Sequence, residues 1–136
     1  MKNKIQNKIS TLIEAYEFSL LEECYSNSFG DYYKIYSKDK IRIRIVCDKS
    51  LFSIDISREN DFKIQWFDML LIKAYIYKDT DLTKTLNYEE YYIFIENNLE
   101  YICDLYSEKN YFKTIQELIV LEKERAKQMF PPDFFG

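Results

Sequence analysis

The sequence contains no histidine, and its 136 residues include only two glycines, two prolines and three cysteines. Without histidine, a Ser-His-Asp triad, a Cys-His pair and the histidine-based zinc and iron sites are excluded. Gly30 is the only internal glycine, so neither a dinucleotide fingerprint nor a P-loop can be formed. Carboxylates, lysine, tyrosine and cysteine are left for catalysis, a set that glycosidases and metal-dependent nucleases use.

Cysteine usage and hydropathy indicate where the protein resides. Cys24, Cys47 and Cys103 are far apart in the sequence, so no C-x-x-C motif or four-cysteine zinc site is present. We expect them to be small buried hydrophobes in a reducing compartment. No apolar stretch of signal-peptide length follows the first eight residues, and no window approaches a membrane span. These features predict a cytoplasmic protein that does not associate with a membrane and binds no metal or cofactor.

The chain length and composition predict one domain over residues 1–136. A mass of 16.6 kDa is enough for one hydrophobic core, and the composition is 47% hydrophobic and 31% charged. That balance is typical of a globular protein rather than of a disordered tail.

Hydrophobic periodicity predicts a helix followed by four strands in the first half of the chain. Apolar residues from Ile5 to Tyr16 recur at helical spacing, which predicts a helix over residues 2–16. We then expect strands over residues 18–25, 32–37, 41–47 and 51–57, of which the last two alternate clearly, with turns at Gly30 and at residues 38–40. We expect these strands to form an antiparallel meander.

The third and fourth of these strands carry enough pattern to predict their register. A two-residue loop at residues 49–50 would pair Ile45 with Ile54 and Ile43 with Ile56 on the buried face. The same register sets Arg44 opposite Asp55 on the other face, so hydrophobic pattern and charge agree.

The second half of the chain predicts three helices. The first follows Asp68, a candidate N-cap, the second runs from about Tyr88 to Tyr106, and the third follows Asn110 and stops before Pro131. Because helices and strands are segregated along the chain, we expect an α+β fold. It has an N-terminal helix, a four-stranded antiparallel sheet, and three helices packed on one face of that sheet.

Negative charge is concentrated in the predicted helix over residues 88–106. Eight acids and one lysine, Lys84, lie between Asp79 and Glu108. On a helical wheel, four of these acids fall within about 80° of one another, opposite the apolar face. These four are Glu89, Glu96, Glu100 and Asp104.

The acidic stripe has two interpretations. It can be a solvated surface that keeps a protein of pI ≈ 5.0 in solution, or it can be a docking surface for a basic partner. Tyr92 and Tyr101 are candidate interface anchors beside the acids, because tyrosine is enriched at binding hot spots. An alternative is a structural or adaptor protein that self-associates through Tyr- and Phe-rich surface, and we expect a monomer or a homodimer.

Two further sets of residues are candidate sites. Alternation places one polar set on a common sheet face, where it would resemble an RNA-binding sheet. We expect a solvated face and no nucleic acid, because the chain is acidic. The set is Tyr32, Lys34, Tyr36, Arg42, Arg44 and Asp55.

The second set is acidic. Asp48, Asp55 and the Asp61-Phe62-Lys63 triplet weakly resemble a metal-dependent nuclease core. Because the triplet falls in a predicted loop, we expect no enzymatic activity from it.

Several segments together resemble a known group of proteins. They are Ser28-Phe29-Gly30, Ile41-Arg42-Ile43-Arg44, Asp55-Ile56, Trp66-Phe67-Asp68 and the segment from Leu121 to Pro131. This pattern resembles small bacterial immunity proteins encoded beside secreted polymorphic toxins. The resemblance implies a cytoplasmic, non-enzymatic protein that neutralises a basic toxin domain by binding, and it implies no individual binding residue.

Overall fold

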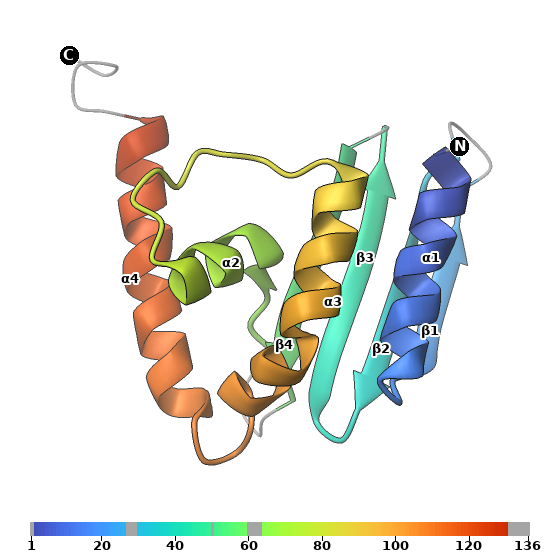
Figure 1. Ribbon diagram of the computed structural model, residues 1–136, viewed down its shortest axis with the longest axis horizontal. Coiled ribbons are helices and arrows are strands. Elements are labelled where there is room, and N and C mark those ends of the chain that lie inside the picture. Colours follow the sequence, from blue (N-terminus) through green and yellow to red (C-terminus); the bar gives the residue numbers. More distant parts are fainter. Residues whose placement is uncertain (1, 27–29, 50, 60–63, 131–136) are drawn as a thin grey trace.

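A five-stranded antiparallel sheet and four helices make up the fold (Figure 1). The computed structural model describes residues 2–26, 30–49, 51–59 and 64–130. The predicted α+β class is confirmed, with a short fifth strand in addition. The elements are α1 (Lys2–Ala15), β1 (Ser19–Tyr25), β2 (Tyr32–Lys38), β3 (Ile41–Asp48), β4 (Leu51–Arg58), β5 (Phe67–Asp68), α2 (Met69–Tyr77), α3 (Tyr88–Leu105) and α4 (Tyr111–Met129).

The core lies between one face of the sheet and the helices. Figure 1 shows α1 and α3 lying side by side across the sheet, with α2 beside β4 and α4 outermost. α4 packs mainly on α2, and its Arg125 reaches the sheet through an ion pair with Asp68 of β5 at 3.1 Å. The sheet residues at the centre of this core are at most 6% exposed: Tyr36, Ile41, Ile43, Ile45, Cys47, Ile54 and Ile56.

The predicted register of β3 and β4 is confirmed. Ile43 lies opposite Ile56 and Arg44 lies opposite Asp55, as pattern and charge together required. The Arg44 guanidinium donates to Asp55 Oδ2 at 2.9 Å and lies 4.2 Å from the centre of the Trp66 ring. An ion pair and a cation–π contact therefore hold the outer face of the sheet, which the helices leave uncovered.

The predicted polar sheet face is wrong for β2. The β2–β3 turn contains two residues, Asp39 and Lys40, with Asp39 at φ 54°, and not the three residues expected. Lys38 therefore pairs with Ile41, and every β2 side chain lies on the face opposite to the predicted one. Tyr36 is 1% exposed in the core, while Arg42 and Arg44 share the outer face with Ile35.

Helix caps fix where α2 and α3 begin. Asp68 accepts from the Leu70 amide at 2.9 Å, which confirms the predicted cap of α2. α3 begins with a capping box between Asn87 and Glu90, which the sequence analysis did not identify. Asn110 occupies the cap position of α4, but its side chain donates to the Asp104 carbonyl instead. The predicted stop at Pro131 lies outside the described residues.

Candidate functional site

The four predicted acids form an exposed row along α3, which we call the acidic flank. Its members are Glu89, Glu96, Glu100 and Asp104. The opposite face of α3 carries the buried residues Tyr91, Phe94, Ile95, Leu99, Ile102 and Leu105. Because this buried stripe fixes the rotation of the helix, the flank has to face solvent.

The capping box sets the start of α3 and hence the place of each acid. The Glu90 amide donates to Asn87 Oδ1 at 2.9 Å, and the Asn87 amide donates to Glu90 Oε1 at 3.0 Å. Glu90 is thus engaged at the helix N-terminus, whereas the acidic flank begins one residue earlier, at Glu89, and continues toward the C-terminus.

The two predicted tyrosines lie on different sides of α3. Tyr92 is half-buried beside the acidic flank, where the negative charge of Glu96 raises the pKa of its phenol. Tyr101 is 49% exposed and follows nine positions later, which is about 180° around the helix. Its phenol lies close enough to Tyr75 of α2 to affect the pKa of that residue. The two tyrosines therefore border the acidic flank on opposite sides, Tyr92 next to Glu96 and Tyr101 next to Glu100 and Asp104.

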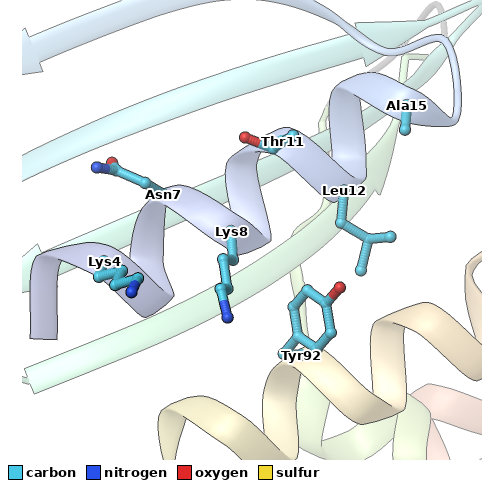
Figure 2. Close-up of a pocket in the computed structure, with 7 residues that line it drawn as sticks. All are labelled: Lys4, Asn7, Lys8, Thr11, Leu12, Ala15 and Tyr92. Carbon is cyan, nitrogen blue, oxygen red and sulfur yellow. The ribbon is translucent and has the colours of Figure 1, made fainter. Parts of the chain in front are cut away.

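A groove between α1 and α3 borders the acidic flank. Its volume is ≈ 550 Å³, and Tyr92 supplies its α3 wall while α1 supplies the other (Figure 2). The α1 wall consists of Lys4, Asn7, Lys8, Thr11, Leu12 and Ala15. This groove was not predictable from the sequence, because the hydrophobic periodicity indicates both helices but not that they are neighbours.

The helices α1 and α3 run in the same direction. Tyr92 meets the middle of α1 in the groove, and Tyr16, just beyond the end of α1, donates to the Glu96 carbonyl at 3.4 Å. Lys4 and Lys8 therefore lie beside the first turns of α3, while Glu96, Glu100 and Asp104 follow farther along. The lysines of the groove thus lie beside the start of α3, and most of the acidic flank lies farther along that helix, outside the groove lining.

The far end of the acidic flank lies near the β2–β3 turn. Cys103 is half-buried there, close enough to Lys38, Asp39 and Glu100 to respond to their charges. Burial raises the pKa of its thiol, so Cys103 is a neutral packing residue at physiological pH rather than a thiolate nucleophile.

The described residues contain no cluster suited to metal chemistry. No group of three or more Cys, Asp or Glu side chains in those ranges could hold a metal ion. Asp48 ends β3, whereas Asp55 lies in the middle of β4 and is paired with Arg44, so the structure does not bring these carboxylates together. Asp61 and Lys63 of the weak nuclease pattern lie outside the described residues.

Asp55 lies in a desolvated environment on the outer face of the sheet. Burial raises the pKa of Asp55, and the hydrogen bond and charge of Arg44 oppose that shift. A carboxylate that is desolvated by the packing of a sheet face and paired with a cation is typical of a structural ion pair. The arrangement thus offers binding surfaces and no assembled reaction centre in the described ranges.

Comparisons with known proteins give no indication of the function of this chain. No family model, curated protein or solved structure matches this chain. The resemblance to immunity proteins therefore stays a prediction. Within the described ranges, no helix is long and apolar enough to cross a membrane.

Proposed function

We propose that this protein is a non-catalytic binding protein of the cytoplasm, of the immunity type, which neutralises a basic toxin domain by covering its surface. The observation that carries the proposal is the acidic flank of α3: four exposed acids on one side of one helix, with no lysine or arginine anywhere in that helix. The mechanism is steric occlusion of the toxin after electrostatic capture.

Repulsion within the acidic flank supports this interpretation. Glu96, Glu100 and Asp104 follow one another at i, i+4 spacing, and each such like-charged pair costs an isolated helix about 0.2–0.5 kcal/mol. A partner's arginine or lysine side chains would relieve this repulsion. Complementary charge of this kind accelerates association and rejects wrong partners.

The lysines of α1 restrict where a basic partner can lie. Lys4 and Lys8 flank the first turns of α3, so positive charge on the partner is favoured toward Glu96 and Glu100 and disfavoured at the opposite end. Tyr92 lies between the two zones and offers a ring and a hydroxyl as an anchor. The bound partner thus has to present its cations toward Glu96 and Glu100, away from the lysines of α1.

Charge reversal on α3 tests the proposal. The immobilised protein first captures partners from a lysate of its source. The main captured protein is then purified, and its affinity for this chain is measured by titration. Finally, the captured protein is expressed in cells with and without this chain, and growth reports its toxicity. We expect a basic, growth-inhibiting partner whose affinity falls by at least about tenfold with Glu96→Lys and Glu100→Lys together. Association with the unmodified chain should slow severalfold as salt is raised.

A matched variant on α4 is the control. Glu122→Lys with Glu124→Lys changes the net charge equally, at exposed positions on another helix, and should leave affinity within about threefold. Equal loss in both variants, an association rate indifferent to salt, or a captured partner that is harmless to cells would each contradict the proposal.

Self-association through aromatic surface is the second candidate function. Phe112 is 75% exposed and Val120 is 63% exposed, and eight-residue spacing places them on one side of α4. This candidate predicts a dimer in light scattering that Phe112→Glu dissociates. A monomer at a protein concentration of about 100 μM would exclude a stable dimer of this kind.

A further inference from the structure

The two edges of the sheet differ in how they are covered. At one edge, β4 is followed by the short β5, and α2 packs against both. At the other edge, β1 pairs with β2 only, and no other strand within the described ranges pairs with β1. All seven residues of β1 are exposed (Figure 1, where β1 lies beyond α1). An edge strand of this kind can accept a further strand.

The side chains of β1 include apolar groups that a partner could cover. Leu20 is 45% exposed, Leu21 is 54% exposed and Tyr25 is 59% exposed. The pairing with β2 shifts between Leu20 and Glu22, which leaves Leu21 without an opposite residue. The two ends of β1 are therefore apolar.

The middle of β1 and its surroundings are acidic. Glu22 accepts from the Tyr33 hydroxyl at 2.7 Å, and Glu23, opposite Lys34, accepts from the Tyr25 hydroxyl at 3.2 Å. Beside Cys24 of β1, a hollow of ≈ 250 Å³ opens on the outer sheet face, and its described lining includes Asp31 and Asp48 but no lysine or arginine.

This charge pattern decides between two occupants of the edge. If two copies paired antiparallel about a twofold axis through the middle of β1, either the two Glu22 side chains or the two Glu23 side chains would lie directly opposite each other. Like charges directly opposite each other destabilise a strand pair. An incoming strand with lysine or arginine would instead place cations beside Glu22, Glu23 and the aspartate-lined hollow. The acids therefore disfavour a second copy and favour a basic segment.

We propose that β1 is a strand-addition site, which takes an extended, lysine- or arginine-bearing segment of a partner protein as the sixth strand of the sheet. Backbone hydrogen bonds to the free edge supply affinity, and the acids of β1 select positive charge. This inference uses none of the α3 residues, so it stands or falls separately from the proposed function.

Two seven-residue peptides, matched to β1 in length, test the site. One is acetyl-Lys-Val-Lys-Val-Lys-Val-Lys-amide, and the other has glutamate in place of every lysine. The readouts are hydrogen exchange and nitrogen-15 resonance shifts of the full protein. We expect the basic peptide to slow exchange of the outward-facing β1 amides at least about tenfold at saturation, and the acidic peptide to leave them unchanged.

Two variants separate this site from the acidic flank. Glu22→Lys with Glu23→Lys should reverse the preference between the peptides, while Glu96→Lys with Glu100→Lys on α3 should leave protection of β1 intact. If the β1 variant fails to fold, the comparison of the two peptides on the unmodified protein still decides.

Four results would overturn the strand-addition site. They are equal protection by both peptides, no protection by either, resonance shifts confined to α3, and β1 protection that appears without peptide together with a dimer in light scattering. Shifts confined to α3 would still agree with the proposed function, so the two failures are distinguishable.

Discussion

β1 and β3 pair with opposite edges of the same strand, β2, yet their environments differ completely. In β3, buried and half-buried residues alternate from Ile41 to Cys47, because the helices cover one face and β4 continues the ladder. In β1, every residue is exposed. The comparison teaches that pairing with a neighbouring strand on one side does not bury a strand. What lies beyond the strand and over its faces decides whether it stabilises the fold or remains open to a partner.

Core truncation should give the largest contrast between the two strands. Ile45→Ala removes a side chain that is 1% exposed and should lower the free energy of unfolding by about 2–5 kcal/mol. Leu20→Ala in β1, where the side chain is 45% exposed, should cost less than about 1 kcal/mol. Urea unfolding followed by Trp66 fluorescence measures both, and similar losses would show that β1 is as buried as β3.

The outer face of β3 should give an intermediate effect. Arg44→Ala leaves the half-buried Asp55 without its cation and removes the contact with Trp66, which should cost about 1–2 kcal/mol. Arg42→Ala is the comparison variant, because its partner Glu59 is 55% exposed at 3.4 Å, and a loss below about 1 kcal/mol is expected. A double-mutant cycle with Asp55→Asn isolates the pair.

The burial of Asp55 on the outer face also predicts a pH dependence of stability. Burial holds the pKa of Asp55 above its ordinary value of 3.8, so the folded state binds this proton more tightly than the unfolded state. Stability from Asp55 is full below pH 3.8 and is lost as pH rises through the folded pKa. The free energy of unfolding of the unmodified protein, minus that of Asp55→Asn, should fall across that window. A difference independent of pH would contradict the assignment.

Substitution on the open edge should give the smallest effect. Leu21→Lys, at a bulge residue that is 54% exposed, should change the free energy of unfolding by less than about 0.5 kcal/mol. Amides of β1 should also exchange with deuterium before those of β3, because edge strands open locally at low cost. Equal protection of both strands would indicate that β1 is covered in solution.

The same comparison explains how much of the fold could be predicted. The β3–β4 register was predictable because two independent patterns, the isoleucines and the Arg44–Asp55 pair, required the same alignment. Asp68 was predictable as a cap from local chemistry alone. β1 offered no alternation, so its sequence predicts a strand without predicting which residues are covered.

The errors came from features that depend on neighbours in space. The turn at Asp39–Lys40 is one residue shorter than expected, and this difference moves Tyr36 from the predicted outer face into the core. β5 is two residues long and forms only because β4 lies beside it. Similarly, the exposed side of α3 was predictable, but the lysines of α1 that border it were not, since they depend on packing.

The shared direction of α1 and α3 has an electrical consequence. Each helix carries about half an elementary charge at each end, positive at its start and negative at its close. Because the two helices lie side by side and parallel, their dipoles add instead of cancelling. The negative poles of both helices lie toward the C-terminal end of α3, where Glu100 and Asp104 already contribute negative charge. An approaching polycation would therefore exert a torque on the whole molecule and turn that end toward itself before any contact is made.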